Sequence, residues 1–204
     1  MEKFEIPANV LMSVGKIVLQ ISKKEPRICM HNIQIVNLNG FATAVATDGH
    51  VLLVVEFSPS LDFLEDGIVI PAECIKPLKF TKKQLQEEVL TVEWEDIRDS
   101  TVELENDRVT VVRGNERHSS EIRDRYYPKW RNLFSSSGSG TAQLDPRLLY
   151  LMGQCVEILG VPMVNMHIEH RGESGAMVSV RNCNAYGLIM PYRSYGPYSL
   201  PEWI

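Results

Sequence analysis

A length of 204 residues with 44% hydrophobic residues is enough for one large domain or two small ones with an ordinary core. The net charge of −5 argues against a ligand, such as nucleic acid, that would be held by electrostatic attraction to the whole protein surface. Four cysteines without C-x-x-C spacing exclude a zinc ribbon, and with no signal-peptide or membrane-span pattern they predict free thiols in a cytoplasmic protein.

The first segment predicts a strand, a helix and further strands. "KFEIP" is short and extended, and apolar residues recur at helical spacing from Val10 to Ile21, which predicts an amphipathic helix over residues 8–24. "CMHNIQIVNLNG" and "FATAVA" read as strands joined by an Asn-Gly turn at residues 39–40. The helix interval holds three lysines and no acidic residue, so positive charge gathers on particular segments of an acidic chain.

A polar tetrad, Thr47-Asp48-Gly49-His50, interrupts the apolar run "ATAVATDGHVLLVVEF". Asp and Gly tolerate the backbone conformations of a tight turn, and the valine-rich flanks favour strands on both sides. The tetrad therefore predicts a turn between two strands. An Asp/His pair that binds metal or transfers protons is the alternative at this stage.

The second segment repeats this order of elements. "DGIVIPAECIKPLKF" predicts a strand that ends at Pro71 and then a short helix, limited by Pro77. "VLTVEWE" alternates apolar and polar residues, and "STVELENDRVTVVRG" reads as a hairpin that turns at Asn106-Asp107. We expect these strands to be solvated on one side.

The third segment follows the linker "FSSSGSG". Asp145 predicts a helix cap, with Pro146 at the first helical position and Gly160 just past the end. "MVNMHIEH", "AMVSVRN" and "YGLIMPYR" then predict three strands, followed by the tail "SYGPYSLPEWI". Three segments of about 65 residues with one plan predict repeated units in which the helices share one side and the sheets the other.

Four stretches give the plan a family context. "VATDGHVLLVV" resembles the "VATDGHRLA" stretch of the bacterial DNA polymerase III beta sliding clamp, and "GIVIP" with its helix resembles the start of a clamp half-domain. "RYYPKWRNL" is similar to the clamp's "RFPDYRRVLP", and "YGLIMPYR" to its "YVVMPMRL". The resemblance implies an α+β fold built from clamp-like βαβββ half-domains, with helices on one face and antiparallel sheets on the other.

The resemblance also implies a division of the chain. Residues 1–134 correspond to one clamp-like domain of two half-units, about 1–60 and 66–134. Residues 141–193 correspond to a third half-unit, and residues 194–204 form a C-terminal tail. Twelve halves could come from four chains in a ring, with the third half completing its sheet on a neighbour or standing alone; the sequence leaves both open, and a homo-oligomer is expected only as one option.

In the family, a hydrophobic cleft receives short peptides from polymerases and other partners. Carried over by motif, its positions are Thr47, Gly49, His50, Val51, Leu52, Pro71, Ile75, Leu188, Met190, Pro191 and Tyr192. Val51 replaces a basic residue of the family and Tyr192 a methionine, which puts the partner preference in doubt. Residues of this kind also fill ordinary cores, and that is the competing interpretation.

The polar face of the first helix, with Asn9, Ser13, Lys16, Gln20 and Lys23 at three- or four-residue spacing, suggests contact with the phosphates of double-stranded DNA. The residues expected to face DNA are Lys16, Gln20, Lys23, Lys24, Arg27, Lys76, Lys79, Lys82, Lys83 and Arg147. Lysines would hold phosphates without reading sequence, which suits sliding. A solvated lysine face is the alternative.

No nucleophile motif or metal-ligand spacing occurs, and His167 and His170 fall on opposite sides of a predicted strand. We therefore expect no catalysis, no metal and no cofactor. The leading hypothesis is a clamp-like tether for a polymerase or other clamp-binding proteins. The alternative is a clamp-fold adaptor, decoy or regulator that never encircles DNA. The tail, with apolar anchors in "YSLPEW", either packs locally or occupies the peptide cleft.

Overall fold

A computed structural model describes residues 2–61, 67–95, 107–135, 138, 140 and 142–192. Residues 100–106, which include the first strand of the expected hairpin, and residues 193–204, which include the tail, lie outside these residues. The strands are Glu2–Pro7 (β1), Asn32–Leu38 (β2), Phe41–Thr47 (β3), Val51–Pro59 (β4), Ile68–Pro71 (β5), Val89–Glu95 (β6), Arg108–Arg113 (β7), Glu116–Glu121 (β8), Met166–His170 (β9), Ala176–Val180 (β10) and Ala185–Ile189 (β11). The helices are Ala8–Val18 (α1), Ala72–Ile75 (α2), Lys82–Glu87 (α3), Arg131–Phe134 (α4) and Pro146–Ile158 (α5), with 3-10 turns at Ile28–His31 (η1), Met163–Asn165 (η2) and Gly172–Ser174 (η3).

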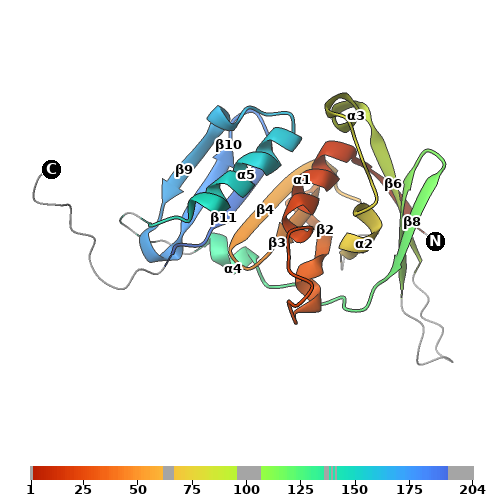
Figure 1. Ribbon diagram of the computed structural model, residues 1–204, viewed down its shortest axis with the longest axis horizontal. Coiled ribbons are helices and arrows are strands. Elements are labelled where there is room, and N and C mark those ends of the chain that lie inside the picture. Colours follow the sequence, from red (N-terminus) through yellow and green to blue (C-terminus); the bar gives the residue numbers. More distant parts are fainter. Residues whose placement is uncertain are drawn as a thin grey trace, which may run out of the picture.

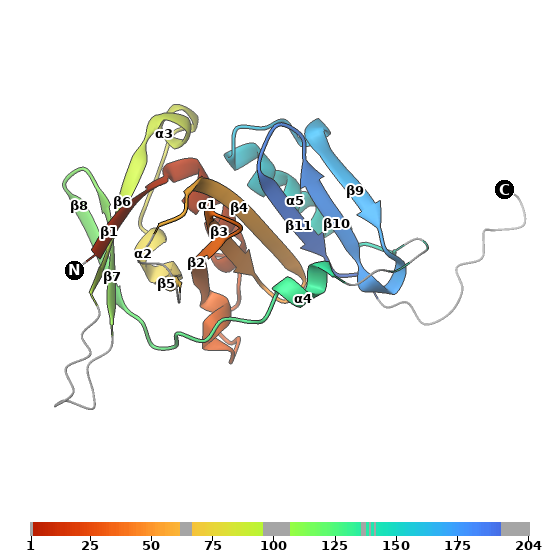
Figure 2. The same ribbon diagram turned by 180° about the vertical axis from the view of Figure 1, so that it is seen from behind.

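The strands form two antiparallel sheets. One has four strands in the order β1-β6-β7-β8, and the other has seven in the order β5-β2-β3-β4-β11-β10-β9. The two long helices, α1 and α5, pack side by side on one face of the seven-stranded sheet (Figure 1). In the opposite view, the strands of this sheet lie in front of the two helices (Figure 2). The α+β architecture, with helices on one face and antiparallel sheets on the other, is confirmed. None of the described helices is long and apolar enough to cross a membrane.

The first two units exchange the strands that precede their helices. β1 leads into α1 but pairs with β6 of the second unit, from Glu2↔Trp94 to Pro7↔Val89. β5 leads into α2 but pairs with β2 of the first unit, up to Asn32↔Pro71. Because each unit supplies a strand to the sheet of the other, neither sheet is complete without both units. The structure therefore binds the two predicted half-units together by backbone pairing.

The third unit continues the sheet of the first unit within the same chain. β11 pairs with β4 from Ala185↔Val55 to Ile189↔Val51, and β10 and β9 follow outward. We call this pairing the β4–β11 seam. The sequence left open whether the third unit completes its sheet on a neighbour or stands alone, and the structure shows a third arrangement. β9 is left as one edge of the seven-stranded sheet, and β5 is the other.

Helix α1 starts at the predicted residue and buries the predicted stripe, with Leu11, Val14 and Ile17 fully buried. It ends at Val18 rather than at residue 24, so Lys23 and Lys24 lie beyond the helix. The N–H groups of Gln20 and Ile21 bond back to Ile17 and Val18, three residues earlier, and this tighter turn closes the helix. The expected helical lysine face is therefore shorter than its sequence pattern.

Close packing accounts for the glycine inside α1. A Cβ placed on Gly15 would lie 2.5 Å from Cδ1 of Ile75 on α2. Ser13, expected on the polar face, is instead fully buried, and its hydroxyl donates to the carbonyl of Val10 at 2.8 Å. Asn9 donates to the carbonyl of Leu159 at the end of α5. This side of α1 thus contacts its neighbouring helix as well as solvent.

Candidate functional site

Side chains within the tetrad fix the turn between β3 and β4. Oδ1 of Asp48 accepts hydrogen bonds from the N–H groups of His50 at 2.8 Å and Val51 at 2.7 Å. Oγ1 of Thr47 accepts from the N–H of Gly49 at 3.0 Å, and Gly49 has φ of 89°, where a side chain would be strained. The predicted turn is confirmed, and the Asp48 carboxylate binds backbone N–H groups, including that of His50, rather than the His50 imidazole.

The turn meets the last strand of the third unit. Leu52 lies opposite Leu188 and Val51 opposite Ile189, and the carbonyl of His50 accepts from the N–H of Met190 at 2.8 Å. Seven residues of the predicted peptide cleft therefore lie on or beside the β4–β11 seam with its turn, together with Thr47 and Gly49. The seven are His50, Val51, Leu52, Leu188, Met190, Pro191 and Tyr192.

Only part of this group is accessible. Val51, Leu52 and Leu188 are buried, with at most 2% of their surface exposed. Gly49, His50 and Tyr192 are exposed, and Met190 and Pro191 are half-buried. We call Gly49, His50, Met190, Pro191 and Tyr192 the turn surface. The buried members hold the strands in place, so any partner would contact the turn surface.

Two residues that the motif did not assign to the cleft lie beside the turn. A Cβ placed on Gly49 would be 3.6 Å from both terminal nitrogens of Arg27 and 3.9 Å from Cε of Met30. Arg27, expected on the DNA face, instead donates to Glu25 at 2.6 Å; this hydrogen bond raises the pKa of Arg27 and lowers that of Glu25. No spacing rule in the sequence points to either contact, because η1 brings them in from a separate loop.

Pro71 and Ile75 do not join the turn surface. Pro71 pairs with Asn32, and β2, β3 and β4 lie between its strand and β11. Ile75 is fully buried, with its side chain against Gly15 of α1. Both residues belong to the interior of the first two units, so neither is available to a peptide at the turn.

An apolar pocket of about 370 Å³ lies over the β4–β11 seam, at the opposite end of these strands from the turn. It is lined by Leu38, Asn39, Val54, Glu56, Trp130, Arg131, Phe134 and Tyr186. Val54 and Tyr186 are cross-strand partners in the seam, and the rings of Trp130 and Phe134 meet edge to face at 6.2 Å. We call it the aromatic pocket; sequence reasoning did not predict it.

The stretch around Trp130 is held to the sheet by polar contacts. Nε1 of Trp130 donates to Oε1 of Gln34 at 2.9 Å, and the hydroxyl of Tyr127 donates to the carbonyl of Val45 at 3.1 Å. Burial raises the pKa of Tyr127, so this hydroxyl keeps its proton and remains a donor. The "RYYPKWRNL" stretch thus forms one wall of the aromatic pocket.

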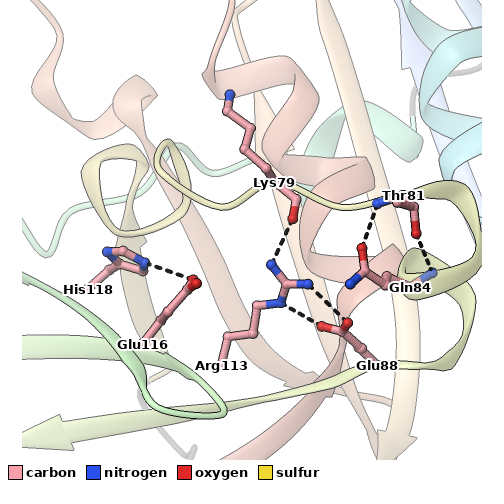
Figure 3. Close-up of polar contacts among 7 residues, drawn as sticks. All are labelled: Lys79, Thr81, Gln84, Glu88, Arg113, Glu116 and His118. Atoms are coloured by element: carbon pink, nitrogen blue, oxygen red, sulfur yellow. Dashed lines mark hydrogen bonds and ion pairs between the residues drawn. The ribbon is translucent and has the colours of Figure 1, made fainter.

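An arginine on β7 holds the lysine-bearing segment between α2 and α3 (Figure 3). Arg113 donates to both carboxylate oxygens of Glu88, at 2.6 and 3.0 Å, and to the carbonyl of Lys79 at 2.7 Å. Its guanidinium also lies 4.3 Å from the ring centroid of Phe80. The hydrogen bond with Arg113 lowers the pKa of Glu88 and raises that of Arg113.

A capping box then starts α3. Oγ1 of Thr81 accepts from the N–H of Gln84, and the side chain of Gln84 accepts from the N–H of Thr81 at 2.9 Å (Figure 3). Lys82 and Lys83 are the first residues of this helix and are exposed. Their backbone is therefore well defined although their side chains extend into solvent.

Lys16 and Lys82 come together on the helix side of the molecule. They line one groove of about 670 Å³ with residues of α3, of α5 and of the segment just after α5: Leu85, Gln86, Gln154, Glu157, Ile158, Gly160, Val161 and Pro162. Gln86 ties the two walls, because its amide donates to the carbonyl of Ile158 at 3.0 Å. We call it the helix groove. It is lined by one lysine from each of the first two units and by the side-chain amides of Gln86 and Gln154.

The other expected DNA contacts are dispersed. Arg147 is paired with Asp145 at 2.6 Å and Lys83 with Glu87 at 3.9 Å, so part of their charge is neutralised. Lys23 lines a separate pocket of about 360 Å³ that also contains the acids Glu25, Glu73 and Glu121. Gln20, Lys24, Lys76 and Lys79 are exposed. Of the ten residues expected to face DNA, Lys16 and Lys82 line one groove, and the other eight lie elsewhere on the surface.

Two of the thiols and one imidazole are buried or hydrogen-bonded. Burial raises the pKa of Cys74 and of Cys155 to about 12, which keeps both thiols protonated. Nδ1 of His170 accepts from the N–H of Ala142 at 3.2 Å. Within the described ranges, no three His, Cys, Asp or Glu side chains gather as a metal site would require.

Comparison with solved structures defines the class of fold. DNA polymerase III subunit beta from Borrelia burgdorferi, in complex with a natural product, superposes with a TM-score of 0.66 at 11% identity over 95% of this chain. The Bacillus subtilis DNA polymerase sliding clamp gives 0.61 at 15% over 95%, and the Bartonella birtlesii DnaN sliding clamp bound to griselimycin gives 0.62 at 17% over 94%. The chain has the fold of the bacterial beta sliding clamps.

The likeness is one of structure and not of sequence. No protein-family model matches the chain, and no curated protein matches its sequence. This chain spans 64% of the Borrelia clamp, 65% of the Bacillus clamp and 66% of the Bartonella clamp. The clamp fold is therefore present here in a strongly divergent sequence that matches about two thirds of the length of these clamps.

Proposed function

We propose that the protein is a clamp-like tether that holds partner proteins near double-stranded DNA without catalysis, in the cytoplasm. The observation that supports this most is the helix groove, where Lys16 and Lys82 of two units meet on the helix side of a clamp fold. Lysines on flexible stems hold phosphates as point charges, and such contacts exchange easily along a duplex. Binding would be nonspecific in sequence and weakened by salt.

The acidic chain limits how strong this contact can be. Net charge is −5, and Glu157 lies in the same groove as the two lysines. DNA would therefore be held locally, with few phosphate contacts and a modest slope of affinity against salt. If the protein encircles DNA, several copies of the chain would form the ring as a homo-oligomer.

We also propose that partner proteins bind along the β4–β11 seam. Two apolar surfaces flank it, the turn surface with Met190 and Tyr192 and the aromatic pocket with Trp130 and Phe134. Peptides with leucine and aromatic anchors suit shallow apolar sites of this kind. Two of the compared clamps are described with a bound natural product or griselimycin, which supports a ligand site on this fold.

A clamp-fold adaptor that binds partners and never encircles DNA is the second candidate. It is favoured by the ion pairs that neutralise part of the charge of Arg27, Arg147 and Lys83 on the expected DNA face. An adaptor would keep the peptide site and lose the DNA contact. Under either proposal, the division into units 1–60, 66–134 and 141–193 is retained as the working description.

Fluorescence anisotropy with a labelled duplex at low and moderate salt separates the two candidates. We expect Lys16→Ala/Lys82→Ala to weaken binding several-fold and to lower the salt slope by up to about 2, one unit for each lost phosphate contact. Lys3→Ala/Lys129→Ala is the matched control, because it removes the same charge from positions outside the helix groove. Equal loss in both double variants, or no DNA binding by the native protein, would favour the adaptor.

A further inference from the structure

Strand β8 is an open edge at one end of the molecule, far from β9 at the other (Figures 1 and 2). β8 pairs with β7 on its inner side, and no strand in the described ranges pairs with its outer side. An open edge presents unpaired N–H and C=O groups, which natural proteins cover, interrupt or use for pairing. β8 contains no proline and no bulge to prevent pairing.

The hydrogen-bond pattern shows which backbone groups point outward. The N–H of Ile122, just past β8, donates to the carbonyl of Asp107 at 2.7 Å, in line with the β7–β8 register. Antiparallel strands alternate between hydrogen-bonded and non-hydrogen-bonded residue pairs. The backbone N–H and C=O groups of His118 and Ser120 therefore also point toward β7. The N–H and C=O groups of Arg117, Ser119 and Glu121 therefore point away from the sheet.

The side chains of the same residues lie on the solvent face. His118 and Ser120 lie opposite Val111 and Val109, which are fully buried in the core. Side chains alternate along a strand, so the set Arg117, Ser119 and Glu121 projects to the other face, and all three are exposed. The outer edge of β8 thus reads as a basic residue, a small residue and an acidic residue at every second position.

We propose that β8 pairs with β8 of a second copy of this chain, antiparallel, about a twofold axis that passes beside Ser119. In this register Ser119 lies opposite Ser119 of the second copy, and Arg117 lies opposite its Glu121 in both directions. All outward backbone groups then find partners. A slip by one residue would set outward groups against inward ones, and a slip by two would leave a pair of them without a strand partner.

The charges select the same register. Opposite charges directly across an antiparallel pair stabilise it, and like charges destabilise it. With the twofold axis beside Ser119, Arg117 of each copy lies opposite Glu121 of the other. With the axis between His118 and Ser119, Glu116 of each copy would instead lie opposite Glu121 of the other. Arg117 already contacts Glu93, and Glu121 lies opposite Arg108. The shared sheet would therefore have alternating charge across its outer face.

The chain contains its own example of such a junction. β4 and β11 are the last strands of the first and third units, and they pair antiparallel to make one continuous sheet. β8 is the last strand of the second unit, and among the described residues it has no such strand partner. Three other strands also end a sheet: β1 and β5 each contact a strand of the opposite sheet, β1 with β4 and β5 with β7, and β9 is contacted near its end, where Nδ1 of His170 accepts from the N–H of Ala142. These observations favour β8 as the edge that a second copy covers.

This proposal does not rest on the proposed function, because self-association is measured on the protein alone, without DNA. One strand pair buries little surface, so we expect weak association that depends on concentration. Two copies would join four-stranded sheets into one of eight strands. Closure of a larger assembly would need a second contact elsewhere.

Sedimentation velocity over a range of concentrations tests the edge with matched variants. Ser119→Pro removes an outward N–H that takes no part in the β7–β8 pairing, so we expect loss of association with a nearly unchanged melting temperature. Ser119→Ala loses the same hydroxyl contact with Thr110 but keeps the N–H, so it should associate as the native protein does. A native protein that remains monomeric throughout, or equal association by both variants, would overturn the proposal.

Charge reversal tests the register. Arg117→Glu alone sets glutamates against each other, and Glu121→Arg alone sets arginines against each other, so each variant should associate at least several-fold more weakly than the native protein at low salt. When the two variants are mixed, the introduced glutamate of one copy faces the introduced arginine of the other, and the remaining Glu121 faces the remaining Arg117. The mixture should therefore recover association. If the mixture sediments as the sum of the separate variants, the register is wrong.

Discussion

The carbonyl oxygen of His50 accepts a hydrogen bond from the N–H of Met190 at 2.8 Å, which joins the first unit to the last strand of the third unit. His50 ends the tight turn before β4, and Met190 follows β11 directly. The bond continues the β4–β11 seam by one more step, so the turn conformation and the position of the Met-Pro strand depend on each other. The turn surface is therefore a product of two units.

Asp48 is expected to determine the stability of this turn. Asp48→Ala removes two hydrogen bonds to backbone N–H groups and should lower the free energy of unfolding by about 1–2 kcal/mol, at the low end for charged acceptors because the turn is near the surface. Asp48→Asn keeps an acceptor oxygen and should lose less than half of that. Urea unfolding measures both; equal losses would show that charge, and not the hydrogen bonds, holds the turn.

The seam should also be sensitive at a glycine. A Cβ placed on Gly187 of β11 would lie 2.5 Å from Cε of Met152 on α5 and 3.1 Å from the carbonyl oxygen of Leu52. We expect Gly187→Ala to destabilise the protein by about 1–3 kcal/mol, the usual cost of overpacking. Met152→Ala alone leaves a cavity, but in the double variant it makes room for the new methyl group. The double variant should therefore lose less than the sum of the single variants in thermal unfolding, whereas simple additivity would contradict the contact.

Much of this arrangement follows from local sequence. The turn at Asn39–Gly40 has both residues at positive φ, as the Asn-Gly pair predicts, and α5 starts at Pro146 under the Asp145 cap, as its pattern predicts. These features depend on a few neighbouring residues. Helix α1 was predicted too long because its apolar spacing continues to Ile21, while the backbone has already tightened after Val18.

Long-range contacts could not be read in the same way. The seam pairs Val55 with Ala185, which are far apart in sequence, and α1 packs against α5 over the same sheet, so neither strand pattern by itself identifies its partner. The aromatic pocket needs Trp130 and Tyr186 to meet over that seam. Ile75 fits the clamp motif by position, but its burial against Gly15 becomes visible only once α1 and α2 are packed.

The contact between Arg113 and Glu88 predicts a dependence on pH. The hydrogen bond with Arg113 lowers the pKa of Glu88 in the folded chain, so the unfolded chain binds a proton on Glu88 more readily than the folded chain does. Its stabilisation is therefore present above the ordinary carboxyl range and is lost as pH falls through the lowered folded pKa. Glu88→Gln should be less stable than the native protein at neutral pH and approach it in acid.

Thermal unfolding from neutral to acidic pH checks this convergence. Glu87→Gln is the control, because Glu87 is more exposed and only makes a 3.9 Å contact with Lys83 within α3. Its stability should run nearly parallel to that of the native protein, since exposed pairs of this kind contribute little. Parallel curves for Glu88→Gln as well would contradict the assigned role of Arg113.

The two surfaces beside the seam make different predictions for partner binding. If the turn surface holds a peptide, His50→Ala/Tyr192→Ala should weaken binding of a short peptide with leucine and phenylalanine anchors by about tenfold or more, because hot-spot truncations typically cost at least 1–2 kcal/mol. Tyr186→Ala alters the aromatic pocket instead and should leave that affinity unchanged. Both sets lie on exposed side chains, so folding should be preserved. Isothermal titration measures the affinities, and loss only in Tyr186→Ala would move the peptide site to the aromatic pocket, where Trp130 and Phe134 would then provide the anchor contacts.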